Sequence, residues 1–142
     1  MRITATWIAL LSLLLAPAAR ADYYVVVNEG NPLTMLSQKE ALHLFMGRSR
    51  AFPDGRAAVA CDITDDALRG RFYYLLAGMS LPQVNSYWAR LMFSGRSLPP
   101  QRVESEAAMT QRIGNDPAAI GWLPHAPRQK GLRTVLILPD TP

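Results

Sequence analysis

A chain of 142 residues with a formal net charge of +4 is long enough for one domain with a buried core and too short for two. The charge falls to +2 once Arg2 and Arg20 leave with the leader described below, which is too weak a positive bias for a typical nucleic-acid-binding protein. The single cysteine, Cys61, excludes an intramolecular disulfide, so the core alone must hold the fold.

The first 21 residues are typical of a secretory signal peptide. A short basic start precedes the apolar run of residues 7–16, and Ala19-Arg20-Ala21 has the small-x-small pattern of a cleavage site. We therefore expect cleavage between Ala21 and Asp22, which leaves residues 22–142 as the mature domain. The apolar run is short for a membrane span, and an uncleaved anchor is the alternative.

The mature chain is expected to begin with a buried strand and a capped helix. Residues 23–28, YYVVVN, are β-branched or aromatic on both faces, as in an interior strand. Ser37 can cap the following helix, Glu40 completes a capping box, and Gly47 is a natural stop. Such a helix start offers free backbone N–H groups, which is the geometry that binds small anions. A second strand is expected over residues 57–62.

Two helices are predicted next. The first begins near Thr64 or Asp65 and runs to about residue 78, with acidic residues in the first turn, where the helix dipole favours them. The second covers residues 81–93 behind the cap Ser80. Its apolar residues recur at three- and four-residue spacing and predict a core face made of Val84, Tyr87, Trp88, Leu91 and Met92.

The last third of the chain continues the alternation. A short strand is expected over residues 101–103, a helix over 105–113, and a strand over 119–123 in which Gly121 marks a close approach. Residues 134–138, TVLIL, complete the pattern as a buried strand. Strands that alternate with helices predict the α/β class. Within this pattern Cys61 is expected to be a buried thiol that acts as a small hydrophobe.

Several local phrases carry a family resemblance. The segment LFMG at residues 44–47 is similar to an "IFxG" phrase, and Tyr87-Trp88 with FSGR at 93–96 and Pro99-Pro100 is similar to "YWxxxxFTGxGxxPP". The segment AAIGW at 118–122 is similar to a "GAIGYV" strand. In this order the phrases resemble the phosphate-binding-protein-like domain of the type 2 periplasmic binding superfamily. More narrowly, they resemble the small stand-alone proteins named phosphate ABC transporter substrate-binding proteins.

The resemblance implies one lobe-like domain of that fold, with a mixed sheet flanked by about four helices. It also implies a periplasmic solute-binding module for phosphate or another small oxyanion, serving an ABC transporter, with a membrane permease or a sensor as partner. Proteins of this kind hold a tetrahedral oxyanion with backbone N–H groups at helix starts, hydroxyl groups and sometimes an arginine. The candidate ligand-binding residues are Thr34, Ser37, Thr64, Arg69, Ser94, Gly95, Arg96 and Ser105.

Two departures from the family pattern favour an alternative. Asp62-Ile63-Thr64-Asp65-Asp66 stands where the family usually carries a Ser- or Gly-rich anion cradle, and carboxylates repel an oxyanion. The chain also has residues for little more than one lobe of that fold, so a bound anion would stay hydrated. The alternative is a degenerate binding fold that docks to a membrane-bound sensor or transporter and holds no small ligand.

Other chemistry finds little support in the sequence. The chain has no motif of the serine-hydrolase, zinc-protease, phosphate-loop or dinucleotide-binding type, so we expect neither an enzyme nor a cofactor. His43 and His125 have no acidic or cysteine partner at ligand spacing, which argues against a metal site.

Overall fold

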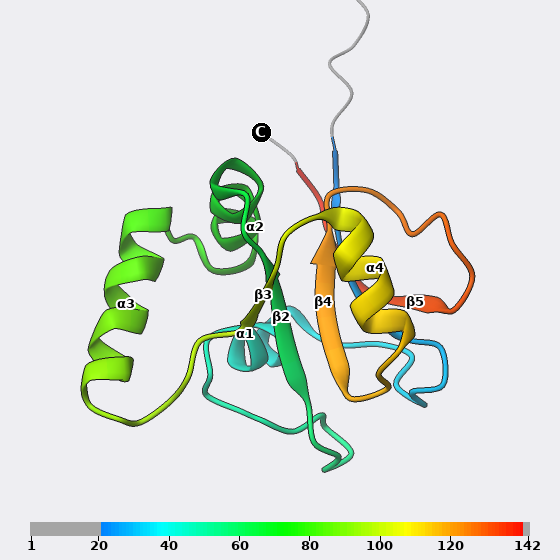
Figure 1. Cartoon of the computed structure of the whole chain (residues 1–142), viewed down its shortest axis with the longest axis horizontal. Coiled ribbons are helices and arrows are strands. Elements are labelled where there is room, and N and C mark those ends of the chain that lie inside the picture. Colours follow the sequence, from blue (N-terminus) through cyan, green and yellow to red (C-terminus); the bar gives the residue numbers. More distant parts are fainter. Residues whose placement is uncertain (1–20, 141–142) are drawn as a thin grey trace, which may run out of the picture.

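The structure is a computed structural model, and it describes residues 21–140 (Figure 1). The leader expected at the N-terminus lies outside the described residues, except for its last residue, Ala21. Its cleavage before Asp22, and the division of the chain into leader and mature domain, therefore stay predictions.

Five strands form one mixed sheet in the order β3-β2-β4-β1-β5. β2 lies parallel to β3 and β4, whereas β1 lies antiparallel to β4 and β5. The carboxyl ends of β2, β3 and β4 therefore lie at one edge of the sheet, which is where helices that follow parallel strands begin. The strands are β1 (Tyr23–Asn28), β2 (Val59–Ile63), β3 (Gln101–Val103), β4 (Ala119–Leu123) and β5 (Leu132–Leu138).

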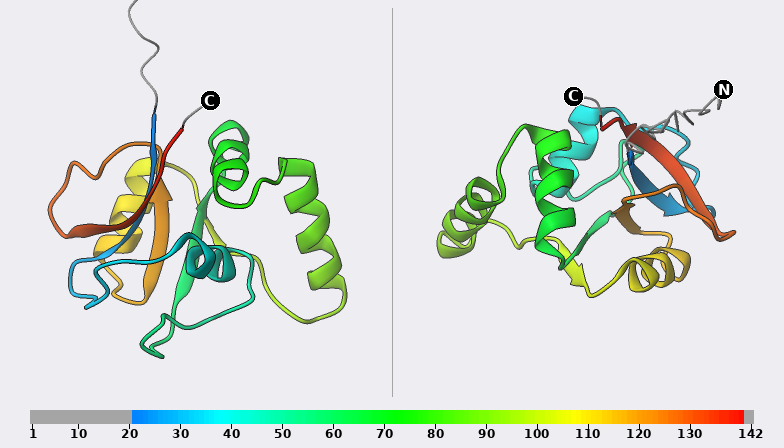
Figure 2. Two further views of the ribbon diagram at one scale, coloured as in Figure 1. Left: turned by 180° about the vertical axis from the view of Figure 1, so that it is seen from behind. Right: turned by 90° about the horizontal axis from the view of Figure 1, so that it is seen from above.

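Four helices complete the domain: α1 (Gln38–Phe45), α2 (Asp66–Ala77), α3 (Leu81–Phe93) and α4 (Glu106–Gly114). α4 covers one face of the sheet, α1 and α2 cover the other, and α3 stands outside α2 (Figure 2). The predicted α/β class, the mixed sheet and the four flanking helices are confirmed.

The predicted helix starts are confirmed in detail. At α1 the Ser37 hydroxyl accepts a hydrogen bond from the Glu40 amide at 3.1 Å, and the Glu40 carboxylate accepts one from the Ser37 amide at 3.0 Å. The hydrogen bond from the Ser37 amide stabilises the ionised carboxylate and so holds the pKa of Glu40 below its usual value. Ser80 and Gln83 form the same reciprocal pair at α3.

An aromatic cluster forms the core between the sheet and α1–α2. The rings of Phe72 on α2 and Trp122 on β4 stack with centroids 4.7 Å apart and planes inclined by 11°. Phe45 of α1 meets Phe72 edge to face, with centroids 5.0 Å apart. Such ring pairs stabilise the core beyond the effect of the apolar area that each large ring buries.

The expected core face of α3 is confirmed at Val84 and Trp88. It is wrong at Met92, which is exposed because the last turn of α3 extends beyond the elements against which the helix packs.

Gly121 lies where α4 crosses β4, as expected. A Cβ added there would stand 2.3 Å from the Met109 sulfur and 3.2 Å from Ile113 Cδ1, both on α4. Gly114, at the end of the same helix, would meet nothing nearer than 3.9 Å. The missing side chain of Gly121 is therefore what lets α4 approach the sheet.

We expect Gly121→Ala to lower the free energy of unfolding by about 1–3 kcal/mol, because an extra methyl group overpacks a buried helix–sheet contact. Urea unfolding followed by tryptophan fluorescence measures the loss. Gly114→Ala is the matched control and should be neutral or slightly stabilising. Equal stability of the two variants would contradict the close-approach assignment.

Cys61 is fully buried on β2, as the sequence predicts. Burial raises the pKa of its thiol to about 11, because the thiolate loses its hydration there. We expect the folded protein to resist alkylation by iodoacetamide at pH 8 and the urea-unfolded protein to react with one equivalent. Mass spectrometry of the two samples measures the difference, and rapid modification of the folded protein would contradict it.

Candidate functional site

Two helices start side by side at the edge where β2 and β3 end. The Thr64 amide donates to the Val103 carbonyl at 3.0 Å and so joins the two strand ends. Asp65 caps α2 by accepting from the Leu68 amide at 3.0 Å, and Ser105 caps α4 by accepting from the Ala108 amide at 3.0 Å. A shallow pocket lies between the two starts, lined by Ile63, Asp65, Leu68, Glu104, Ser105, Glu106 and Ala107. We call it the edge pocket.

The edge pocket is acidic. Asp65, Glu104 and Glu106 line it, and the exposed Asp66 begins α2 beside it. Glu106 also contacts the ring of His125, whose Nε2 lies 2.7 Å from the carboxylate. Negative charge at a helix start is favourable. Here the protein supplies that charge itself, so the place that an anion would take at these two helix starts already faces carboxylates.

Arg69 lies one turn into α2 and is buried in the core. Its Nε donates to Asp62 at 2.8 Å, and its Nη1 donates to Asn85 at 3.2 Å. The side chains of Arg69 and Asp62 are 2% and 1% exposed. Arg69 is also not among the residues that line the edge pocket. Its charge is therefore matched by a protein carboxylate inside the domain.

Asp62 receives two further hydrogen bonds at its place on β2. The Tyr73 hydroxyl donates to it at 3.0 Å, and Trp122 Nε1 on β4 donates to it at 2.9 Å. Burial raises the pKa of Tyr73 well above its usual value, so its hydroxyl keeps the proton that it donates. A buried charge pair needs this full set of partners to offset its desolvation.

The other candidate residues lie elsewhere. Thr34 and Ser37 precede α1, and the neighbouring Gln38 side chain donates to the Leu75 and Leu76 carbonyls near the end of α2. Since α2 has 12 residues, its end lies about 18 Å from its start and from the edge pocket. The exposed segment 94–96 follows the far end of α3 (Figure 1). The structure therefore brings Thr64 and Ser105 together and leaves Thr34 with Ser37, and Ser94 with Gly95 and Arg96, in separate groups.

Sequence reasoning missed Glu104, Glu106 and His125 at this edge. A local signal existed for the two glutamates, because they flank the predicted cap Ser105. No local signal paired His125 with Glu106, since the contact joins the loop after β4 to the first turn of α4.

A second hollow lies at the opposite end of β2 and has a volume of about 210 Å³. Buried beside it are Trp88 Nε1 and Ser97 Oγ, two polar atoms with no hydrogen-bond partner among residues 21–140. Gly47 fits against both residues, because a Cβ there would stand 2.7 Å from Ser97 Oγ and 2.6 Å from the Trp88 ring. The remaining wall is largely apolar and includes Leu44, Val59, Leu98, Pro99 and Pro100.

Within residues 21–140, no group of three or more His, Cys, Asp or Glu side chains is arranged to hold a metal ion. In the same part of the chain, no helix has the length and hydropathy needed to cross a membrane.

Comparison with known proteins places the fold. Neither a protein-family model nor a curated protein matches the sequence significantly. An ABC-type phosphate transport receptor from Vibrio cholerae matches in structure with a TM-score of 0.60 and 16% identity over 81% of this chain and 46% of the receptor. A phosphate ABC transporter substrate-binding protein from Clostridium perfringens, solved with bound phosphate, matches with a TM-score of 0.63 and 12% identity over 81% of this chain and 45% of that protein.

The chain has the fold of part of a phosphate ABC transporter substrate-binding protein. The resemblance inferred from the sequence is thus confirmed for the fold. The chain spans less than half of the length of either match, and identities this low concern the fold alone.

We expect Asp62→Ala to lower the free energy of unfolding by about 3–5 kcal/mol, because it leaves the buried Arg69 charge without its carboxylate. Guanidinium unfolding followed by circular dichroism measures the change. Asp66→Ala, which removes an exposed carboxylate four residues away, is the matched control and should cost about 1 kcal/mol or less. Similar losses in the two variants would mean that the buried pair does not hold the core.

Proposed function

We propose that this protein is an exported, receptor-like domain that binds another protein at the periplasmic side of the cell envelope, through its acidic edge, and holds no free oxyanion. The proposal rests on one observation. The two helix starts that an oxyanion would use are capped by Asp65 and Ser105 and surrounded by the carboxylates of Asp65, Glu104 and Glu106.

Magnitudes favour this assignment over anion binding. A helix start at a protein surface stabilises an anion by about 0.3–1 kcal/mol. A carboxylate 4 Å from the same anion costs about 4 kcal/mol at the effective dielectric constant of about 20 near a surface. Arg69 does not restore the balance, because its guanidinium already binds Asp62. Repulsion therefore exceeds the attraction that the two helix starts offer.

The described part of the chain supports the same conclusion. Residues 21–140 form one sheet, and the chain spans less than half of each phosphate receptor that it matches, so nothing in the described residues encloses an anion at the edge pocket from a second side. An anion bound at one open edge stays hydrated, and its contacts remain weak. The same open edge suits a protein surface, since exposed carboxylates form charge-assisted hydrogen bonds with Lys and Arg side chains. A basic segment of a membrane permease or sensor is the partner class that fits.

Binding of a phosphate-like oxyanion is the second candidate, because one of the matched structures was solved with bound phosphate. It would require the anion to bind away from the edge pocket or as a protonated species that donates a hydrogen bond to a carboxylate.

Calorimetric titration separates the two functions. Residues 22–142 are titrated with phosphate, sulfate and molybdate up to millimolar concentrations, and we expect no binding heat from any of them. Submicromolar binding of one anion would overturn the docking proposal in favour of the second candidate.

A photo-crosslinking amino acid at Ala107, beside the edge pocket, tests docking directly in the cell envelope. We expect one crosslinked partner, which is lost when Glu104 and Glu106 are both changed to Lys. Glu29→Lys is the matched control, because it reverses an exposed charge outside the edge pocket, and it should leave the crosslink intact. Crosslinking that survives the double reversal would contradict docking through the acidic edge.

A further inference from the structure

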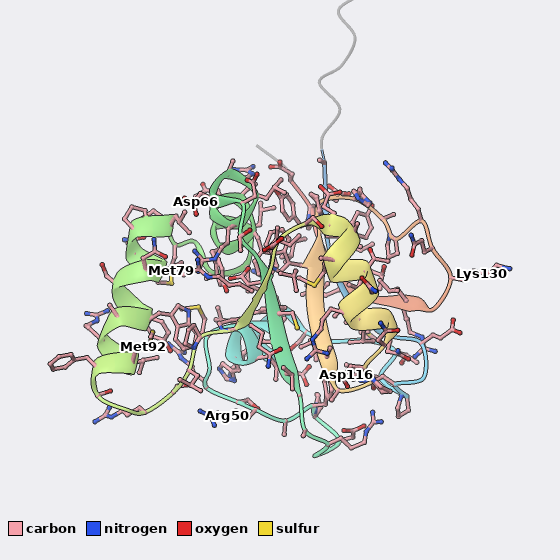
Figure 3. All side chains as sticks on the ribbon, in the orientation of Figure 1. Arg50, Asp66, Met79, Met92, Asp116 and Lys130 are labelled. Atoms are coloured by element: carbon pink, nitrogen blue, oxygen red, sulfur yellow. The ribbon has the colours of Figure 1, made fainter. Side chains whose placement is uncertain are left out.

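α3 ends in an apolar projection that the rest of the domain does not cover. Phe93 is 97% exposed, Leu98 76% and Met92 53%. These three residues fall in the last turn of α3 and the loop that follows it, within seven residues of sequence. Figure 3 shows Met92 on the side of the molecule away from the sheet. We call residues 90–100 the α3 tip.

Isolated exposed apolar side chains are ordinary, but a group of them marks a contact surface. The other exposed large apolar residues are Met35 before α1 (75%), Tyr74 on α2 (57%) and Ile137 on β5 (49%). None of these three has another exposed large apolar residue within six residues of sequence. The α3 tip is therefore the place in the described chain where such residues gather.

The tip also carries charge of one sign. Residues 67–103 contain no Asp or Glu and five arginines, of which Arg90 and Arg96 are exposed at the tip. The exposed Arg50 lines the hollow next to Leu98 and so adds a third positive group beside the tip. The acidic Asp66 lies on the upper part of the domain in Figure 3, whereas Met92 and Arg50 lie on its lower part.

The helix that carries the α3 tip is fixed to the rest of the domain. The Tyr87 hydroxyl donates to the Met46 carbonyl at 2.6 Å, and Trp88 packs against Gly47, so the middle of α3 is fixed to the end of α1. The chain turns after the helix at Gly95, whose φ of +70° suits glycine, and the Arg96 amide donates to the Leu91 carbonyl at 3.1 Å. The apolar side chains are thus presented by a capped helix end.

We propose that the α3 tip docks onto an anionic lipid surface. Phe93, Leu98 and Met92 enter the boundary between headgroups and acyl chains, while Arg90 and Arg96 contact headgroup phosphates. A lipid surface fits better than a protein partner for two reasons. Three projecting side chains are too few for a stable protein interface, which takes about 800 Å² from each partner. A rim of arginine without any carboxylate is complementary to a uniformly negative surface.

Flotation with lipid vesicles tests the proposal on residues 22–142, which include every described helix and strand. We expect binding to vesicles of phosphatidylglycerol and phosphatidylethanolamine and none to phosphatidylcholine alone. Binding should weaken strongly between 0.1 M and 1 M salt, as the Debye length falls from about 10 Å to about 3 Å. Equal binding to both kinds of vesicle would overturn the electrostatic part of the proposal, and no binding to either would overturn all of it.

Matched variants test whether the α3 tip is the surface that binds vesicles. The double change Phe93→Ser and Leu98→Ser should weaken vesicle binding by at least about tenfold, because it removes the inserted apolar groups. The double change Arg90→Gln and Arg96→Gln should weaken it by about twenty-fivefold, at about fivefold for each arginine. Met35→Ser with Ile137→Ser removes as many exposed apolar residues elsewhere and should leave binding unchanged.

Circular dichroism confirms that each variant is folded. The proposal fails if the tip variants bind vesicles as the unchanged protein does. It also fails if the unchanged protein does not bind vesicles and instead self-associates through the tip, as measured by sedimentation velocity. Neither outcome bears on the acidic edge, because Glu104 and Glu106 are intact in every variant.

Discussion

One buried carboxylate organises this domain. Asp62 lies on β2, an interior strand, and accepts hydrogen bonds from Arg69 and Tyr73 of α2 and from Trp122 of β4. A charge so fully enclosed is tolerated only because a guanidinium and two neutral donors surround it. The same arrangement commits Arg69 to the interior. An arginine one turn into a helix is well placed to reach a ligand at the helix start, and here it holds the sheet to the helix instead.

The neighbouring edge has the backbone geometry of an anion site and the opposite electrostatics. α2 and α4 begin side by side because they follow the parallel strands β2 and β3. Ligand sites of α/β folds commonly lie at such strand ends. Around these starts the side chains are acidic, with Glu104 and Glu106 on one side and Asp65 on the other. The match to phosphate receptors therefore describes the backbone, and the function follows from the side chains that this chain places on it.

Local patterns predicted most of the fold and part of the site. Ser37, Ser80 and Ser105 were recognisable as caps because capping acts within three residues, and Gly121 was recognisable because a strand interior otherwise avoids glycine. Thr64 and Ser105 were predicted only as separate candidates, and the parallel pairing of β2 with β3 is what brings them together. The hydrogen bond that Trp122 donates to Asp62 and the contact between His125 and Glu106 join different elements of the chain, and no sequence periodicity predicts them. Periodicity also extended the core face of α3 to Met92, where the helix runs past the body that it packs against.

The position of β1 has a consequence for how the chain acquires its shape. Val27 pairs with Ile120 and Tyr23 pairs with Leu138. The first strand to be synthesised therefore cannot complete its pairing until the last two strands have been synthesised. Closing so long a segment is slow, because entropy must be lost before any of these contacts form. Until then the nascent polypeptide cannot complete the pairings of β1 with β4 and β5. Under the export that we propose, this late closure favours translocation of an unfolded chain, whose sheet closes only after passage.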